Sequence, residues 1–200
     1  MPLVRHLDDP RQDGTGGTLA LPLLSERLVL RLLHPDDLDD VHAYQRLPEV
    51  ARYLFRPPRT REDCARLLAD GPVTPGWDHD GDKAILGITR HHQPGVVGEI
   101  MLKLDDARAQ QMEIGWIVHP DHAGQGYATE AARTVAVAAF EQLDAHRIFA
   151  RLDADNAASA RVCERLGMRR EAHLVENDLD LDGRWASEYV YGALADDLLR

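Results

Sequence analysis

The sequence predicts one mixed α/β domain of 200 residues, and three observations support this fold class. Candidate elements follow in the order strand, two helices, three strands, helix, strand, helix and two strands. The composition, 44% hydrophobic and 28% charged residues, is ordinary for a globular domain with a full core. No internal repeat or low-complexity block divides the chain, so we expect a single domain.

The first third of the chain contains an arm, a strand and two helices. Residues 1–24 begin with a polar segment rich in Gly and Asp, and we expect a mobile N-terminal arm, with the domain covering residues 25–200. ERLVLRLL, residues 26–33, alternates as a strand does. HPDDLDDVHAYQRL then carries an early proline and early acidic residues, which favour a helix start. In PPRTREDCARLLAD, Thr60 is a candidate N-cap, and residues 71–81 form a Pro- and Gly-rich loop.

The centre of the chain predicts an antiparallel meander followed by a helix. KAILGITRH, VVGEIMLKL and MEIGWIVH are strand candidates joined by turn-like segments. Residues 127–143 are helical by periodicity, because small apolar residues recur on one face. The stripe consists of Ala128, Ala131, Ala132, Val135, Ala136 and Ala139. Since it is nearly all alanine, this helix should lie close to a sheet.

The last third predicts a strand, a helix and a hairpin. HRIFARLDAD is the strand, and NAASARVCERLG is the helix. Asn156 suits the N-cap of this helix, and Gly167 suits its left-handed C-terminal position. EAHLVENDLDLDGRWASEYVYGAL reads as a hairpin that turns at residues 181–184.

Charge and cysteine content exclude several classes of protein. There are 34 acidic and 23 basic residues, a formal net charge of -11, which argues against nucleic acid as the main partner. The same balance is compatible with a cationic substrate. Two isolated cysteines, Cys64 and Cys163, give neither a disulfide framework nor a zinc pattern. No run of 18 apolar residues predicts a membrane span, so we expect a cytoplasmic protein without a membrane partner.

The segment AGQGYATEAA, which follows a strand and opens a helix, is the most informative motif. The first N–H groups of a helix lack intrahelical partners, and glycines let the backbone approach an anion closely. A simple tight turn is the alternative. A Rossmann fingerprint would need a third glycine where Thr129 stands, and a P-loop would need Gly-Lys-Ser/Thr where Gly126-Tyr127-Ala128 stands. Neither nucleotide-binding fold fits.

The longer run MEIGWIVHPDHAGQGYATEA resembles motif A of the GNAT N-acetyltransferases, whose Arg/Gln-x-x-Gly-x-Gly/Ala pattern binds the pyrophosphate of coenzyme A. Ala123 departs from the usual Arg or Gln at the first position. SERLVLRLLHPDD, VVGEIML, NAASARVCERLGMRREAHL and DGRWASEYVYGAL resemble, in order, further segments of the branch that contains the ribosomal-protein N-terminal acetyltransferases. The resemblance covers residues 25–194.

This resemblance implies a fold, a cosubstrate and a set of binding residues. The fold is a twisted, mostly antiparallel sheet of about seven strands, flanked by helices on both faces. The cosubstrate is acetyl-CoA, and family members are often homodimers. The backbone of Ile117, Val118 and His119 would hold the pantetheine arm, with an N–H near Val118 as the oxyanion donor. The other implied coenzyme contacts are Ala123, Gly124, Gln125, Gly126, Tyr127, Ala128, Asn156 and Ser159.

Acetyl transfer to a primary amine needs a base for the amine and an acid for the leaving thiolate. By resemblance, the base is Glu113, at the start of a strand, or Asp178, on the predicted hairpin; Glu99 is a weaker candidate. Many relatives place a Tyr where Val162-Cys163 stands here, so Ser159 is the better candidate for a hydroxyl near the sulfur. A core role for Cys163 and a helix-turn role for Ser159 are the alternatives.

The acceptor stays open at this stage: a protein N-terminus, or a small cationic amine such as a polyamine or an aminoglycoside. A non-catalytic acyl-CoA-binding domain on the same scaffold is the alternative from a different class. The histidines share no helical face with a completing carboxylate, so no metal site is predicted. DLDLDG begins like a calcium-binding loop, but Tyr189 stands where that loop needs a Glu.

Overall fold

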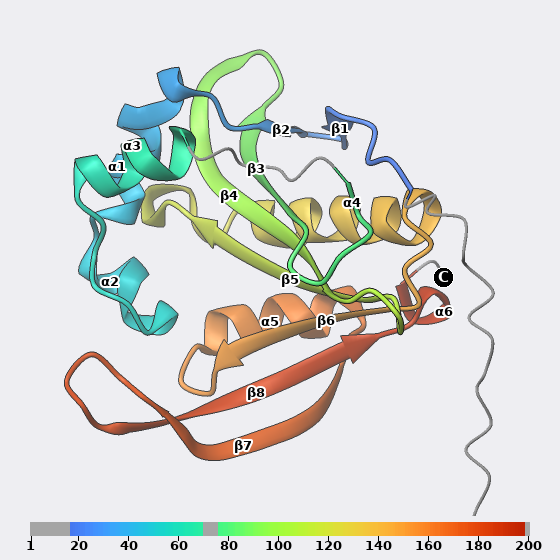
Figure 1. Ribbon diagram of the computed structural model, residues 1–200. Coiled ribbons are helices and arrows are strands. Elements are labelled where there is room, and N and C mark those ends of the chain that lie inside the picture. The colour runs from blue at the N-terminus through green and yellow to red at the C-terminus, as the bar shows by residue number, and fades with distance from the viewer. Residues whose placement is uncertain (1–16, 70–75, 199–200) are drawn as a thin grey trace, which may run out of the picture.

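The computed structural model describes residues 17–69 and 76–198. Residues 1–16 of the predicted arm and residues 71–75 of the predicted loop lie outside the described residues. An eight-stranded sheet in the order β1-β2-β3-β4-β5-β6-β8-β7 runs through the molecule (Figure 1). Among the strand pairs of the described residues, only β5–β6 is parallel. The predicted α/β class with a mostly antiparallel sheet is therefore confirmed, with one strand more than expected.

The strands are β1 (Leu23–Leu24), β2 (Leu28–Leu32), β3 (Lys83–Arg90), β4 (Gln93–Asp106), β5 (Gln111–Val118), β6 (Arg147–Asp153), β7 (Arg169–Leu179) and β8 (Trp185–Ala193). The α-helices are α1 (Leu38–Gln45), α2 (Pro48–Ala51), α3 (Arg61–Ala69), α4 (Tyr127–Gln142), α5 (Ala157–Leu166) and α6 (Ala195–Leu198). Three short 3-10 turns are η1 (Pro35–Asp37), η2 (Arg52–Leu54) and η3 (Pro120–His122).

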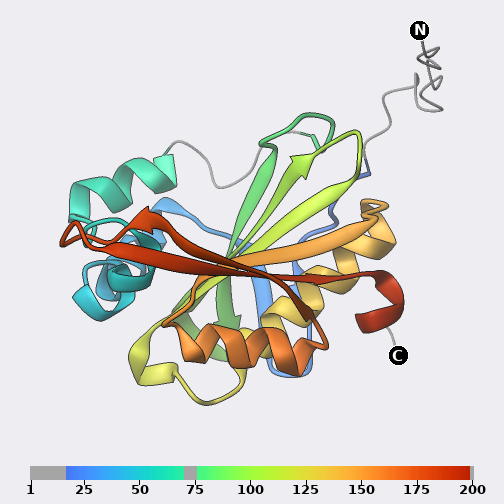
Figure 2. The same ribbon diagram turned by 90° about the horizontal axis from the view of Figure 1, so that it is seen from below.

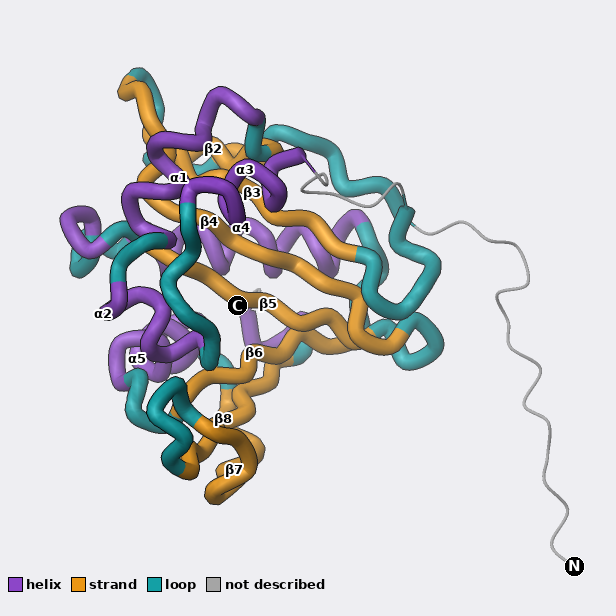
Figure 3. Tube along the Cα trace, turned by 60° about the vertical axis from the view of Figure 1, so that its left-hand side comes forward, coloured by secondary structure: helices purple, strands orange, loops and turns teal. Residues whose placement is uncertain are grey.

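Helices cover both faces of the sheet, as predicted. In Figure 3, α1 and α3 lie in front of β3 and β4, whereas α4 lies behind them; Figure 2 shows α5 on the same side of the sheet as α4. The alanine stripe of α4 is buried in the larger core together with alternate residues of β4 and β5, such as Ile100 and Ile114. A smaller core lies under α1 and α3; it contains Tyr44, and Ile117 packs against it. Because side chains alternate along a strand, each strand residue faces one of the two layers of helices.

The domain begins before residue 25. Strand β1 pairs antiparallel with β2, which adds the eighth strand. Leu19 and Leu23 are buried in the larger core, and the Ala20 N–H donates to the Gln142 side-chain oxygen over 2.8 Å. Residues 17–24, which the sequence assigned to a mobile arm, are therefore part of the packed domain, because two leucines there supply apolar surface to α4.

Predicted helix ends agree with the structure. Thr60 and Asp63 cap each other reciprocally: the Asp63 N–H donates to Thr60 Oγ1 over 3.1 Å, and the Thr60 N–H donates to Asp63 Oδ2 over 2.9 Å. Gly167 ends α5 at a φ of 86°. The β7–β8 turn closes one residue earlier than predicted, with the Gly183 N–H donating to the Asp180 carbonyl. None of the helices in residues 17–69 and 76–198 is long and apolar enough to cross a membrane.

Candidate active site

The sheet opens between its two parallel strands. The β5–β6 ladder extends only from the Gln111–Arg147 pair to the Glu113–Phe149 pair, and Figure 1 shows the two strands diverging beyond it. β5 nevertheless stays paired with β4 as far as Val118. The His119 N–H donates to the Val97 carbonyl on the β4 side over 2.9 Å. Because backbone groups alternate along a strand, the N–H of Val118 points to the open β6 side.

A cleft of about 470 Å³ lies at this opening. It is lined by the end of β5, by the turn that precedes α4, by the first turns of α4 and α5, and by the segment from α2 to η2. Most of the predicted coenzyme contacts lie here: Ile117, Val118, Ala123, Gly124, Gly126, Tyr127, Ala128, Asn156 and Ser159. His119 and Gln125 do not line the cleft, whereas His122, which the sequence analysis did not select, does.

The glycine turn presents unpaired backbone donors to the cleft. Gly124 and Gly126 have φ angles of 75° and 83°, a region that favours glycine. Gly126 is the N-cap of α4 and provides no side-chain cap. The first helical hydrogen bond is donated by the Glu130 N–H to the Gly126 carbonyl, so the three N–H groups before Glu130 have no intrahelical partner. A helix N-terminus of this kind attracts anions through both its free donors and its dipole.

Thr129, in the first turn of α4, is a cleft residue that the sequence analysis missed. Its Oγ1 is buried and has no hydrogen-bond partner among the described residues. A buried hydroxyl without a partner carries a desolvation penalty, which a ligand acceptor would relieve. Its place in the first turn of the helix that follows the two glycines was the available signal.

The N-terminus of α5 brings Asn156 and Ser159 to the same cleft. The Ser159 N–H donates to Asn156 Oδ1 over 3.0 Å, so Asn156 caps the helix as predicted. Cys163 lies in the core instead: it is completely buried, and burial raises the pKa of its thiol to about 12. It is not among the cleft-lining residues. The core alternative for Cys163 is therefore confirmed.

The carboxylates proposed as bases lie outside the cleft. Glu113 sits on the face of the sheet opposite α4, and its Oε2 is 3.0 Å from Lys103 Nζ on the neighbouring strand. Asp178 is exposed on β7 and accepts the N–H of Leu179 over 2.8 Å. Glu99 is buried beneath α1, where it accepts hydrogen bonds of 2.8 Å from the Tyr44 hydroxyl and from Gln45. None of the three lines the cleft.

A second cavity, of about 1090 Å³, lies beside the cleft. Its walls are the α2–η2 segment, the end of β6 and the β7–β8 hairpin, and Glu49 lines both cavities. Asp153, the last residue of β6, is buried in its wall. Burial raises the pKa of this carboxyl, although its Oδ1 accepts the N–H of Asp155 over 2.8 Å. Asp153 was not selected from the sequence, and its place at the end of a predicted strand was the available signal.

The described residues contain no group of three or more His, Cys, Asp or Glu side chains that would hold a metal ion. Positively charged side chains do line the cleft: they are Arg161 and Arg165, which are one turn apart on α5. Together with the free N–H groups of α4, they make this cleft suited to a ligand that carries phosphates.

Comparisons with known proteins agree with this geometry. Residues 27–169 match the family described as "Acetyltransferase (GNAT) domain". The uncharacterised N-acetyltransferase YnaD of Bacillus subtilis is 26% identical over 88% of this chain and 98% of its own length.

Among solved structures, a GNAT-family acetyltransferase from Bacillus anthracis superimposes with a TM-score of 0.77, at 27% identity over 87% of this chain and 98% of the other. The Vibrio cholerae spermidine N-acetyltransferase in complex with CoA and spermine has the same fold, with a TM-score of 0.74 at 21% identity over 88% of this chain and 100% of the other. The family match covers well over half of the sequence, and it coincides with the opened sheet and the glycine turn. The chain belongs to the GNAT acetyltransferase family.

Proposed function

We propose that this protein transfers the acetyl group of acetyl-CoA to a primary amine of a cationic acceptor. The diphosphate would lie on the free N–H groups between Gly124 and Ala128, and the pantetheine arm would follow Ile117 and Val118 into the open seam between β5 and β6. The observation that carries this proposal is the combination of unpaired helix donors and an unpaired strand edge in one cleft. The CoA complex of the Vibrio cholerae protein, which has the same fold, supports it.

The second cavity supports a cationic acceptor. Six carboxylates line it against two arginines, one of which, Arg184, is already paired with Asp180 and Asp182. The six carboxylates are Glu49, Asp153, Asp155, Glu176, Asp180 and Asp182. An excess of one sign of charge in a cavity raises the local concentration of ligands of opposite charge. The exposed Trp185 and the neighbouring Tyr189 offer apolar and aromatic surface for the body of such an amine. The spermine bound to the Vibrio cholerae protein belongs to this chemical class.

The residues would divide the chemistry as follows. Asp153 accepts a proton from the acceptor ammonium, directly or through one water, and its raised pKa brings it closer to the working pH of a base. The free amine then forms the C–N bond at the thioester carbon. The Val118 N–H donates to the oxygen that gains charge, as an oxyanion donor does. The Ser159 hydroxyl donates a hydrogen bond to the sulfur as the C–S bond breaks, and the proton that the attacking nitrogen loses goes to the thiolate, so CoA leaves as the free thiol. Glu113 and Asp178 are the alternative candidates for this base.

The test is a thiol-release assay with acetyl-CoA and a panel of amines: spermine, spermidine, an aminoglycoside, and peptides with free N-termini. We expect release with the polycationic amines, and acetylated product by mass spectrometry. Release with neutral or acidic peptides alone would contradict the cationic acceptor while leaving acetyl transfer intact. Tight CoA binding without release on any amine would identify a non-catalytic acyl-CoA-binding domain. Absence of CoA binding would overturn the proposal as a whole.

A further inference from the structure

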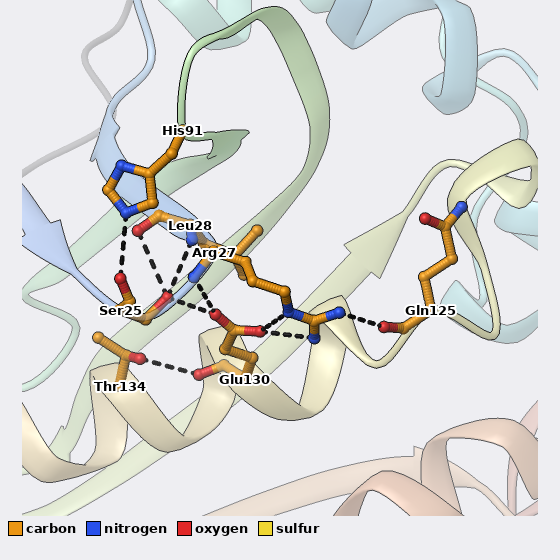
Figure 4. Close-up of polar contacts among 7 residues, drawn as sticks. All are labelled: Ser25, Arg27, Leu28, His91, Gln125, Glu130 and Thr134. Carbon is orange, nitrogen blue, oxygen red and sulfur yellow. Dashed lines mark hydrogen bonds and ion pairs between the residues drawn. The ribbon is translucent and has the colours of Figure 1, made fainter.

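An arginine from another segment of the chain contacts the glycine turn. Arg27, just before β2, reaches across to the turn (Figure 4). Its Nη1 donates to the carbonyl of Gln125 over 3.0 Å. Its guanidinium carbon lies 5.0 Å from the centre of the Tyr127 ring, which lines the cleft. Arg27 itself does not line the cleft.

A carboxylate in the first turn of α4 fixes Arg27 in this position. Glu130 accepts the backbone N–H of Arg27 over 2.8 Å and its Nε over 2.6 Å, and it also accepts the Ser25 hydroxyl over 2.8 Å. Burial opposes ionisation of Glu130, but the hydrogen bonds from Ser25 and Arg27 lower its pKa below the ordinary value. The Glu130 carboxylate thus stays charged and orients the guanidinium toward Gln125.

The contact with Gln125 sets the direction of one peptide plane. In a planar trans peptide, the C=O of Gln125 and the N–H of Gly126 point in opposite directions. Gly126 lines the cleft, whereas Gln125 and Arg27 do not, so the hydrogen bond from Arg27 to this carbonyl directs the Gly126 N–H toward the cleft. Without Arg27 this plane would be free to rotate, because Gly126 adopts positive and negative φ angles almost equally well. A rotated peptide would present an oxygen, rather than a donor, to a phosphate.

We infer that Arg27 is a positioning residue of the diphosphate-binding turn, which it acts on through the Gln125 carbonyl and the Tyr127 ring. The inference rests on the proposed function, since it concerns how the same cleft binds acetyl-CoA. The competing explanation is that Arg27 and Glu130 only fasten β2 to α4. The two explanations predict different effects of an Arg27 substitution on the reaction with an acetyl donor that lacks a diphosphate.

The experiment compares acetyl-CoA with S-acetylpantetheine as acetyl donors for the wild type, Arg27→Gln and Arg27→Lys. For Arg27→Gln we expect a KM for acetyl-CoA raised about tenfold, because one charge-assisted hydrogen bond that orients the binding site is lost. The kinetic constants with S-acetylpantetheine should change less than about twofold, since this donor does not use the turn. Arg27→Lys keeps the positive charge but lacks the planar guanidinium, so its KM for acetyl-CoA should lie between those of the wild type and Arg27→Gln.

Arg31→Gln is the matched control. Arg31 lies on β2 itself and forms a bidentate ion pair with Asp37, with both N–O distances at 2.8 Å, but it does not line the cleft. Its variant loses a comparable ion pair next to the same strand and should leave the KM for both donors unchanged. Melting temperatures of all variants report whether each is folded.

Equal losses with both donors, or an unchanged KM for acetyl-CoA in folded Arg27→Gln, would overturn the inference. Should Arg27→Gln fail to fold, Arg27→Lys decides by the same comparison of donors. If the wild type itself binds neither CoA nor acetyl-CoA, the proposed function fails, and this outcome is seen before any variant is compared.

Discussion

The glycine turn allows a matched test of backbone-mediated phosphate binding. Gly124 in the turn and Gly183 in the β7–β8 hairpin have φ angles of +75° and +74°. A Cβ added at either position meets no atom within 4 Å. Replacing either glycine by alanine therefore costs only the strain of a left-handed L-residue, about 1–2 kcal/mol. In a domain of this size, such a cost lowers the melting temperature by roughly 2–8 °C.

The two variants differ in what their methyl groups face. Gly124 lines the cleft, whereas Gly183 does not. In Gly124→Ala the methyl group occupies space that a phosphate oxygen would need in order to reach the N–H groups of the turn. Losing one charge-assisted hydrogen bond removes about 1.5–3 kcal/mol, which weakens CoA binding by about 10- to 100-fold. In Gly183→Ala the affinity for CoA should be that of the wild type.

Isothermal titration calorimetry with CoA, beside thermal melts of both variants, measures the two effects separately. We expect similar losses of melting temperature and a large difference in the dissociation constant. Wild-type affinity for CoA in Gly124→Ala would refute the reasoning, because it would mean that the backbone at Gly124 does not approach the ligand. Equal weakening in both would assign the effect to general destabilisation.

Three further predictions follow from the same geometry. Asp153→Asn should lower turnover by about 100-fold or more with little change in the KM for acetyl-CoA, measured by thiol release. Burial raises the pKa of Asp153, so the folded state of the wild type gains stability as the pH falls through that pKa, and turnover falls over the same pH range. Both trends should vanish in Asp153→Asn. A variant whose turnover depends on pH as that of the wild type does would reject Asp153 as the base. Burial also raises the pKa of Cys64 and Cys163, so a disulfide reagent should label neither thiol in the native protein and both after denaturation; rapid native labelling would contradict their burial. A Cβ on Gly98 would lie 2.3 Å from the Ile117 carbonyl oxygen, so Gly98→Ala should displace the end of β5 and lower both the melting temperature and the affinity for CoA, and an unchanged variant would show that this strand edge is not needed.

Local signals in the sequence predicted the elements that carry their own stabilising interactions. Thr60, Asn156 and Gly167 mark helix ends because each satisfies or relieves backbone groups within one turn. The alanine stripe predicted the close contact of α4 with the sheet. Strand β1 escaped prediction because two residues carry no periodicity, and they are ordered through the register with β2. Helix α2, Pro48–Ala51, is similarly short, and no periodicity predicted it.

The surroundings of the candidate bases depend on contacts that the sequence alone does not specify. The sequence placed Glu113 at the start of a strand, which agrees with β5, but its Lys103 partner depends on the β4–β5 register, which only the folded sheet fixes. Asp153 reaches the second cavity because β6 ends where the α2–η2 segment, about a hundred residues earlier in the chain, packs beside it. Contacts between such distant segments leave no local pattern in a single sequence.

The departure at Ala123 is compatible with phosphate binding because the cleft obtains its donors and its charge from other places. Peptide N–H groups at the start of α4 provide the donors, and they do not depend on the side chain at position 123. Positive charge comes from α5, whose Arg161 and Arg165 are four residues apart and line the same cleft. The chain as a whole carries a net charge of -11, so these two arginines oppose the long-range repulsion that an anionic coenzyme meets. A motif whose essential parts are backbone groups thus tolerates substitution of its one charged side chain, provided that the turn keeps its conformation.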